Sequence, residues 1–353
     1  MTSARTTRRR RAVRAVLATL AALTVLAAGL GGLVVWQNTY DLSEEPVTVR
    51  HGGRTLQGVL ARPKTGRGPF PLVVFVHGDG PVDATHDGFY RPLWESFARA
   101  GHASLSWNKP GVGGAPGDWL DQTMDDRAAE AADAIAWARQ RPDVDGRRIG
   151  LWGASQAGWV LPKIAAKDPG VAFAIAVSPA VNWLRQGRYN LLAELRRDGA
   201  SDTEVAAALR RRETGLDLLA RGAPYEEYVR AVGDAQGMTA ARWRFVSRNH
   251  TADASADLPA LRRMPVLLVL AGHDVNVDTA ETEAAYRRLL PGPALRVAHY
   301  PDATHGLVDH AVESSSSRLI LSALCAPRSL FVRGFLADQR DFLASVAGAG
   351  AQR

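Results

Sequence analysis

Short strand-like runs alternate with longer helix-like stretches through most of the chain. The run Pro71–Val76 is continuously apolar, as expected of a strand that is buried on both faces of a covered sheet. Further strand-like runs are 103–107, 171–177, 265–270 and 294–299, and helix-like stretches are 91–100, 124–138 and 279–290. This alternation predicts an α/β fold with a mostly parallel central sheet and helices on both of its faces.

The stretch 182–262 breaks the alternation. It is charged and without strand-like runs, and it contains three predicted helices, Leu191–Asp198, Ser201–Arg212 and Tyr225–Gln236. Because strands and helices alternate again after it, we interpret it as a helical cap inserted into the sheet domain. Such a cap is expected to cover the site and to restrict the size of the substrate.

The two ends of the α/β region carry weaker patterns. Val47–His51 and Thr55–Ala61 flank Gly52-Gly53, which predicts a β-hairpin. Ala311–Pro327 includes a row of serines and is predicted to be an irregular insertion, whereas Phe331–Val346 predicts a closing helix.

An uncharged, mostly apolar stretch runs from Ala15 to Trp36. About 20 apolar residues span a bilayer, so this stretch predicts a single transmembrane helix. The arginines before it favour a cytoplasmic N-terminus, which places the rest of the chain outside the cytoplasm. Trp36 and Tyr40 lie where an interfacial aromatic belt is expected. The alternative is a cleaved signal peptide, with a site near Ala27-Ala28-Gly29 and a secreted product.

These patterns divide the chain into six parts. They are a basic cytoplasmic tail (1–14), a transmembrane anchor (15–36), a linker (37–46), the first part of the α/β core (47–181), the helical cap (182–262) and the second part of the core (263–353). A chain of 353 residues is long enough for one large α/β domain with such an insertion.

Composition narrows the function classes. The net charge is +7, but a cluster of arginines without any acid lies in the first 14 residues, so the remainder is close to neutral. We therefore expect no nucleic-acid partner. Cys325 is the single cysteine, which excludes an intrachain disulfide, and we interpret it as a packing residue. Neither H-E-x-x-H nor G-x-x-x-x-G-K occurs, so neither a metal nor another cofactor is expected.

The segment Arg148–Trp159 carries the clearest catalytic pattern. A short apolar run ends at Gly153, Ser155 follows, and a helix-compatible segment begins at Trp159. A serine at the tip of a strand–turn–helix is typical of a nucleophile elbow, whose strained backbone requires small residues two positions away on either side. Those residues are Gly153 and Ala157, so alanine replaces the last glycine of G-x-S-x-G. An ordinary junction with a surface serine is the alternative.

A serine nucleophile needs a base, which an acid must orient. Asp274 follows the strand-like run 265–270 and His305 follows 294–299, and working residues of open α/β sheets lie just past the carboxyl ends of strands. We therefore predict His305 as the base and Asp274 as the acid. The competing residues are the histidines His250, His273, His299 and His310 and the acids Asp278 and Asp302.

The run His77–Gly80 follows the predicted strand 71–76. An oxyanion hole needs two backbone N–H groups, and we expect one from Gln156, the residue after the nucleophile, and one from Asp79. Because a carboxylate beside an oxyanion is unfavourable, the Asp79 side chain is expected to point away. A plain turn at the end of a strand is the alternative for this run.

Together these features resemble the α/β-hydrolase superfamily, over roughly 47–346 and with Ser155, Asp274 and His305 in its chain order. The motifs that carry the resemblance are His77-Gly78-Asp79-Gly80-Pro81, Trp107–Gly113, Gly117-Asp118-Trp119, Gly153–Trp159, Gly272-His273-Asp274 and Ala303-Thr304-His305-Gly306. Members usually carry Asp where Asn108 stands and often Arg where Pro110 stands, both in a structural loop. The combination looks like the esterase and serine-aminopeptidase-like branch with a helical cap.

The resemblance implies a serine hydrolase that cleaves carboxylic esters or thioesters through an acyl-enzyme, without a cofactor. Combined with residues 15–36 as a bilayer anchor, it predicts a membrane enzyme that acts outside the cytoplasm on a small-molecule substrate. Two alternatives stay open: a serine peptidase or aminopeptidase that acts on short peptides, and a non-catalytic binding protein with the same fold.

Overall fold

The computed structural model describes residues 2–51, 53–233 and 237–350. Its centre is an eight-stranded sheet with the order β1-β2-β4-β3-β5-β6-β7-β8. The strands are β1 (Leu42–His51), β2 (Arg54–Pro63), β3 (Phe70–Val76), β4 (Ala103–Trp107), β5 (Val144–Ala154), β6 (Val171–Val177), β7 (Val266–His273) and β8 (Leu295–Thr304). β2 pairs antiparallel with β1 and β4, and all other pairs are parallel. The sheet is mostly parallel, as predicted. Gly52 of the predicted hairpin turn lies outside the described residues.

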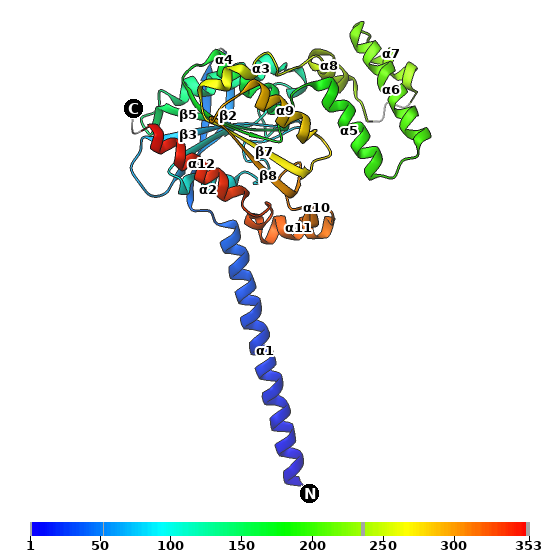
Figure 1. The fold of residues 1–353 in the computed structure, drawn as a ribbon. Helices are drawn as coiled ribbons and strands as arrows, with labels where there is room; N and C mark the ends of the chain where they lie inside the picture. Colours follow the sequence, from blue (N-terminus) through cyan, green and yellow to red (C-terminus); the bar gives the residue numbers. More distant parts are fainter. Residues whose placement is uncertain (1, 52, 234–236, 351–353) are drawn as a thin grey trace.

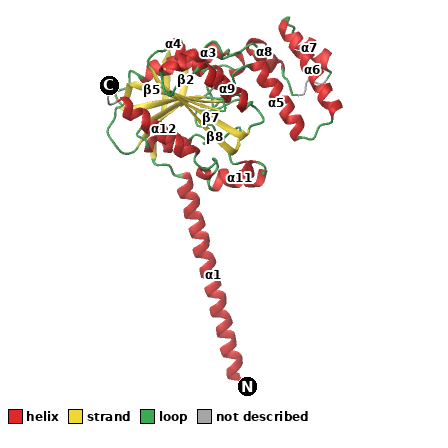
Figure 2. Cartoon of the chain, in the orientation of Figure 1, coloured by secondary structure: helices red, strands yellow, loops and turns green. Residues whose placement is uncertain are grey.

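Helices cover both faces of this sheet (Figure 2). One face carries α3 (Met124–Ala138), α4 (Leu161–Lys167) and α9 (Thr279–Leu289), and the other carries α2 (Arg91–Arg99) and α12 (Phe335–Gly350). In β3, Leu72 and Val74 belong to the first core and Val73 and Phe75 to the second, because successive strand side chains point to opposite faces. All four are fully buried, which accounts for the continuous apolar run that predicted this strand.

Four helices, which we call the cap, lie between β6 and β7. They are α5 (Trp183–Arg197), α6 (Asp202–Ala220), α7 (Tyr225–Val232) and α8 (Ala240–Asn249). The sequence pattern missed α8 because its buried residues Trp243 and Phe245 alternate with arginines. The last residues of the helix predicted to reach Gln236 lie outside the described residues.

The structure corrects two expected boundaries. The linker expected at 37–46 is replaced by the end of α1 (Thr2–Asn38) and by β1, because residues 42–46 pair with residues 59–63 of β2. The closing helix begins at Phe335 rather than Phe331, because Phe331 forms a β-bridge with Val308 before the chain turns into the helix.

The segment predicted to be irregular at Ala311–Pro327 is mostly helical. It forms α10 (His310–Glu313) and α11 (Ser316–Cys325). Cys325 is exposed at the end of α11, so its interpretation as a packing residue was wrong. The row of serines that predicted an irregular segment lies at the start of α11, where Ser315 is the N-cap residue and Ser316 and Ser317 begin the helix.

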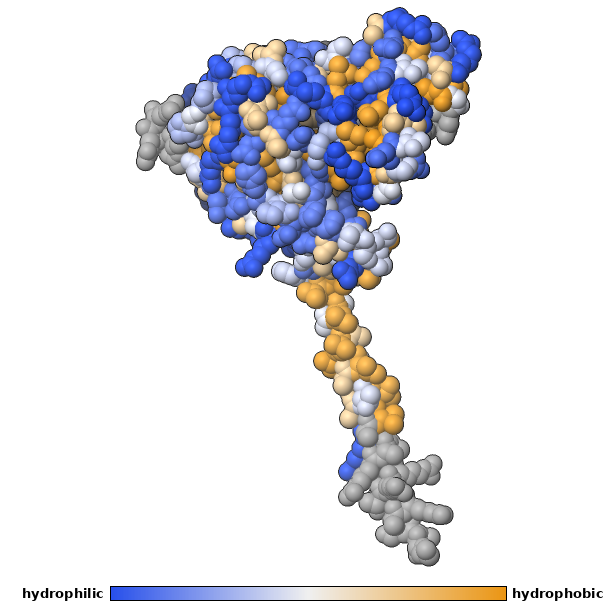
Figure 3. All heavy atoms as spheres, turned by 45° about the vertical axis from the view of Figure 1, so that its right-hand side comes forward, coloured by the Kyte–Doolittle hydropathy of each residue, from blue (hydrophilic) through white to orange (hydrophobic). Residues whose placement is uncertain are grey.

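The helix α1 projects from the body as a long rod (Figure 1). Its segment Val16–Asn38 is the one helix of the described residues that is long and apolar enough to cross a membrane. Its large apolar side chains are exposed, and the rod is hydrophobic from the body outward to the residues drawn in grey (Figure 3).

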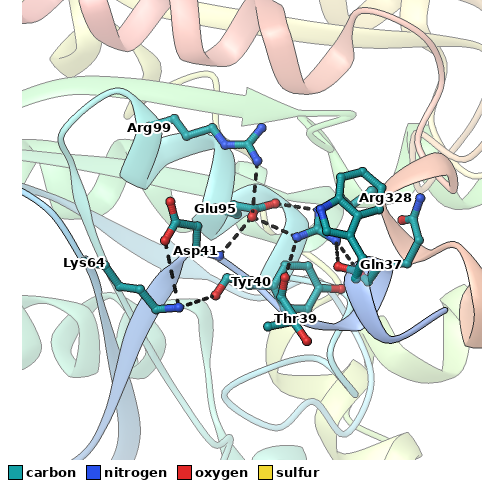
Figure 4. Close-up of polar contacts among 9 residues, drawn as sticks. Gln37, Thr39, Tyr40, Asp41, Lys64, Glu95, Arg99 and Arg328 are labelled. Atoms are coloured by element: carbon teal, nitrogen blue, oxygen red, sulfur yellow. Dashed lines mark hydrogen bonds and ion pairs between the residues drawn. The ribbon is translucent and has the colours of Figure 1, made fainter. Parts of the chain in front are cut away.

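Arg328 fixes the end of α1 to the body (Figure 4). Its guanidinium donates hydrogen bonds of 2.6–2.7 Å to three backbone carbonyls, those of Trp36, Gln37 and Thr39. It also forms two hydrogen bonds, of 2.7 and 2.9 Å, with the buried carboxylate of Glu95 on α2. Burial raises the pKa of Glu95, but the hydrogen bonds and charge of Arg328 outweigh this and lower it below its ordinary value. We call this cluster the Arg328 latch; it gives charged hydrogen-bond donors to backbone carbonyls at and just after the end of α1.

Candidate active site

Ser155 lies at the sharp turn that ends β5. Its φ of 56° is in the left-handed region, which is unfavourable for a residue with a side chain. The chain then continues into a 3₁₀ turn, Ser155–Trp159, and into α4. A Cβ atom added at Gly153 would lie 2.7 Å from the Cβ of Ala157. Glycine is therefore needed at position 153, and once it is there a methyl group is accommodated at position 157.

Asp274 and His305 meet at the ends of neighbouring strands. Asp274 follows β7 and His305 follows β8, and Oδ2 of Asp274 lies 2.8 Å from Nδ1 of His305. The other carboxylate oxygen of Asp274 accepts hydrogen bonds of 2.8 Å from the backbone N–H groups of Asn276 and Val277. The Asp274 side chain is 1% exposed and that of His305 is 20% exposed, so the carboxylate is fixed while the imidazole reaches open space. His305 and Ser155 line the same cavity, of about 460 Å³.

The competing residues have other positions and partners. Asp278 caps α9 by accepting a hydrogen bond from the backbone N–H of Glu281, and Asp302 is exposed. His299 pairs with Glu283. The remaining histidines lie elsewhere: His250 at the end of α8, and His273 stacked on His310. Among the described residues, no group of three or more His, Cys, Asp or Glu is placed to hold a metal ion.

The loop after β3 passes close to Ser155. A Cβ atom added at Gly78 would lie 3.4 Å from the Cβ of Ser155. The next residue, Asp79, directs its carboxylate to the guanidinium of Arg242 on α8 and accepts a hydrogen bond of 3.0 Å from Nε2 of Gln156. Burial would raise the pKa of Asp79, but the hydrogen bonds and charge of Arg242 lower it below its ordinary value. The Asp79 charge is therefore neutralised by the cap.

Two buried cations that sequence reasoning missed hold this loop. Nζ of Lys109 donates hydrogen bonds to the carbonyls of Gly78 and Gly80, at 2.6 and 2.8 Å. Arg127 on α3 donates to the carbonyl of His77 and to Oε1 of Gln156. Burial lowers the pKa of Arg127 to about 10 and that of Lys109 well below its ordinary value. Lys109 lies in the glycine-rich loop 108–117, and no local pattern signals that it reaches across to another loop.

Lys109 determines the direction of one predicted oxyanion donor. The carbonyl of Gly78 and the N–H of Asp79 belong to one trans peptide unit, so they point in opposite directions. Because Lys109 holds that carbonyl, the Asp79 N–H is directed away from Lys109. Lys109 is thus a positioning residue for the loop.

We expect Lys109→Met to lower kcat by about 10²-fold with little change in KM, because a peptide that rotates away removes one oxyanion donor. Steady-state kinetics on a soluble ester measures this effect. Lys163→Met, which removes a partly exposed lysine that pairs with Asp125 and Asp257, is the matched control. Equal kcat values for the two variants would contradict the positioning role.

The cap forms the roof of the cavity. From α5, Trp183, Gln186 and Asn190 line it, and α8 contributes Arg242. The same helix α5 bonds to the loop that carries the acid: Tyr189 Oη donates to the carbonyl of Asp274 at 2.8 Å, and the amides of Gln186 and Asn190 donate to Asn276 and Val275. The cap is therefore hydrogen-bonded directly to the loop of Asp274.

The fold and this arrangement define an α/β hydrolase. The chain belongs to the family described as X-Pro dipeptidyl-peptidase (S15 family), whose model matches residues 52–300. It is 28% identical to the thiohydrolase apmlB of Arthrinium phaeospermum over 288 residues, which cover 71% of this chain and 87% of that protein. It is 33% identical to the polyketide transferase grgF of a Penicillium species over 131 residues. These residues make up 37% of this chain and 42% of that relative, so the chain spans less than half of the relative's length.

Solved structures share the fold at low sequence identity. A 2,6-dihydroxy-pseudo-oxynicotine hydrolase superposes with a TM-score of 0.55 at 15% identity, covering 87% of this chain and 69% of that one. An esterase from Pyrococcus furiosus has a TM-score of 0.54 at 12% identity, covering 87% and 91%. An esterase from Pyrobaculum calidifontis has a TM-score of 0.52 at 19% identity, covering 95% and 98%. The chain therefore belongs to a hydrolase family and has the α/β-hydrolase fold, as its sequence motifs predicted.

Proposed function

We propose that this protein is a membrane-anchored serine hydrolase that cleaves carboxylic esters or thioesters. The observation that carries the proposal is the hydrogen bond between Asp274 and His305, with His305 and Ser155 lining one cavity beneath the cap. Ser155 attacks the substrate carbonyl while Nε2 of His305 takes its proton. Asp274 holds the Nδ1–H tautomer and stabilises the imidazolium. The backbone N–H groups of Asp79 and Gln156 bind the oxyanion.

The cycle closes in two steps. His305 delivers its proton to the leaving alcohol or thiol as the tetrahedral intermediate collapses to the acyl-Ser155 ester. Water then attacks the acyl group with His305 as base, and the acid product and free Ser155 are released. The thiohydrolase relative supports the inclusion of thioesters.

The charge of the cavity favours esters over peptides with a free N-terminus. Recognition of an N-terminal ammonium requires an unpaired carboxylate near the nucleophile. Asp79 is the only carboxylate among the described residues that line the cavity, and Arg242 already pairs with it. A peptidase that removes N-terminal residues, which the family description suggests, is therefore the second candidate.

The helix α1 supports anchoring in a membrane. Its apolar segment is exposed along its length and ends in the Arg328 latch, without a flexible linker between helix and body. With the arginine cluster on the cytoplasmic side, the body lies outside the cytoplasm.

A fluorophosphonate probe tests the proposed function. We expect the native chain to react at Ser155, identified by mass spectrometry of the labelled peptide, and the Ser155→Ala variant to remain unlabelled. A panel of p-nitrophenyl esters beside aminoacyl anilides then separates the two candidates, and we expect turnover of the esters. Turnover of anilides alone would establish the peptidase instead, and an unlabelled native chain without activity would refute both.

A further inference from the structure

The helix α11 exposes a charge-free apolar face. Outside α1, the described residues include four large apolar side chains that are exposed, and three of them, Ile320, Leu321 and Leu324, lie on α11. Their exposed fractions are 57%, 62% and 64%, as high as those along the apolar rod of α1. The helix carries one charged residue, Arg318, near its beginning. Clustered exposure of this kind marks a surface that contacts a partner or a membrane.

The position of α11 beside the end of α1 indicates that this partner is the membrane. Nδ2 of Asn38, the last residue of α1, donates a 2.9 Å hydrogen bond to the carbonyl of Leu324. The Arg328 latch, four residues after Leu324, fixes the same end of α1 to the body. Figure 1 shows α11 beside this end of α1, at the base of the body. The apolar face of α11 is therefore continuous with the end of the apolar rod.

The length of α1 sets the depth of α11. The span Val16–Asn38 has 23 residues. At 1.5 Å per residue this is about 34 Å, slightly more than the hydrocarbon core of about 30 Å. When α1 spans the bilayer, Asn38 reaches the headgroup level, and α11, which is bonded to it, lies at that level too. Interfacial helices place apolar side chains at this depth.

A groove runs from this membrane-facing edge to the wall of the cavity that contains Ser155. It has a volume of about 990 Å³ and is lined by Leu319, Ala323 and Leu324 of α11 and by Asn38 at the end of α1. Its lining also includes charged residues, among them Glu44 and Arg91, which pair with each other. At its inner end, Phe89, Phe331, His86 and Gly306 line both the groove and the cavity that contains Ser155 and His305. Phe89 and Phe331 are in contact, with ring centroids 4.7 Å apart, and form the apolar wall between the two spaces.

We propose that α11 lies in the membrane surface beside α1 and that the groove admits the acyl chain of a membrane-resident ester or thioester from the bilayer to Ser155. This inference rests on the proposed function and names its substrate class: a lipid-borne acyl compound rather than a water-soluble ester. The acyl chain lies along Leu319, Ala323 and the Phe89–Phe331 wall, and the carbonyl reaches Ser155.

Cys325 allows a direct test of the position of α11. It is the only cysteine of the chain and is exposed at the end of α11. The full chain, labelled there with an environment-sensitive nitrobenzoxadiazole fluorophore, is reconstituted into phosphatidylcholine–phosphatidylglycerol vesicles with doxyl-labelled lipids. We expect quenching by the doxyl lipids. The control is a label at Thr203→Cys on α6 in a Cys325→Ser background, and we expect no quenching there because Thr203 is exposed in the cap.

The quenching result decides the membrane contact whether or not the chain hydrolyses esters. An unquenched Cys325 label in vesicles that retain the chain after alkaline extraction would overturn the inference while leaving the anchor in place. A label that is shielded from water only at high protein density, without doxyl quenching, would show a second copy on α11 and would overturn it as well.

A double variant tests the link to activity. Ile320→Gln and Leu321→Gln change only exposed side chains that do not line the groove. We expect it to hydrolyse p-nitrophenyl palmitate in vesicles at least about tenfold more slowly, because the burial of two apolar side chains in lipid is lost. Hydrolysis of soluble p-nitrophenyl acetate is expected to be unchanged. Leu184→Gln, which alters the fourth exposed apolar residue, on α5, is the matched control and is expected to retain both activities.

Ala323→Trp separates the groove from the membrane contact. The indole fills the outer groove without removing an apolar group from α11, so we expect normal doxyl quenching, slow palmitate hydrolysis and normal acetate hydrolysis. Palmitate hydrolysis at the native rate by both the Ile320→Gln/Leu321→Gln variant and Ala323→Trp would overturn the inference. If the native chain does not hydrolyse the acetate ester at all, this would instead contradict the proposed function.

Discussion

Ser155→Ala and His305→Ala are each expected to lower kcat by at least about 10³-fold, and the double variant is expected to be little worse than either single variant. In the proposed mechanism the two side chains act as one unit: without the base the hydroxyl stays protonated, and without the hydroxyl the base has no proton to move. Both line the cavity beneath the cap, so neither is needed for the cores that hold the sheet. Steady-state kinetics on a soluble p-nitrophenyl ester measures these values.

His299→Ala is the control for the loss of a histidine. His299 pairs with Glu283 on the surface, so we expect kcat to stay within about twofold of the native value, as is usual for an exposed pair away from the site. Retained activity in Ser155→Ala would refute the proposed mechanism altogether. Multiplication of the two single losses in the double variant would show that Ser155 and His305 act independently, against the same mechanism.

Asp274→Asn is expected to lower kcat by about 10³- to 10⁴-fold with KM nearly unchanged. The backbone N–H groups of Asn276 and Val277 keep the amide oxygen on their side, so the amide NH₂ faces Nδ1 of His305. Nδ1 must then accept a hydrogen bond, which places the proton on Nε2, and the imidazole loses its ability to take the proton of Ser155. The protein is expected to keep its fold, because the change preserves shape.

Asp302→Asn and Asp278→Asn are the matched controls. Asp302 is exposed, and asparagine is a good replacement for Asp278 at the N-terminus of α9, so we expect at most a small change in kcat for both. A nearly silent Asp274→Asn combined with a damaging Asp302→Asn would reassign the acid to Asp302.

The description of the family suggests peptide substrates, whereas the charges that line the cavity fit the neutral esters of our proposal better. The family is described by an X-Pro dipeptidyl-peptidase activity, whereas the solved structures with the same fold include esterases. In this chain the only carboxylate among the described residues of the cavity is paired with Arg242. Binding an ammonium group there would have to displace that guanidinium. The neutral acyl chain of the proposed substrate meets no such competitor, and the aromatic wall of Phe89 and Phe331 offers it an apolar surface.

Local patterns in the sequence determined the framework of this protein. The apolar run at β3 predicted a buried strand because a strand with both faces covered needs apolar residues at consecutive positions. Gly153, Ser155 and Ala157 predicted a tight turn because backbone crowding two residues from a strained position depends on neighbours in the chain. The long uncharged stretch predicted the apolar part of α1, because the length and composition of a membrane-spanning helix can be recognised in the sequence itself.

Only the tertiary structure decided which distant groups meet. Asp274 and His305 are hydrogen-bonded because β7 and β8 are adjacent and parallel, a pairing that no local pattern encodes. Lys109 and Arg127 hold the loop after β3 from separate elements, and Arg242 reaches Asp79 from the cap. The row of serines predicted an irregular insertion where α11 lies. The exposure of its apolar residues could not be predicted, because exposure depends on what packs against a helix. Their position at the end of α1 follows from the bonds of Asn38 and Arg328, which join segments far apart in the chain.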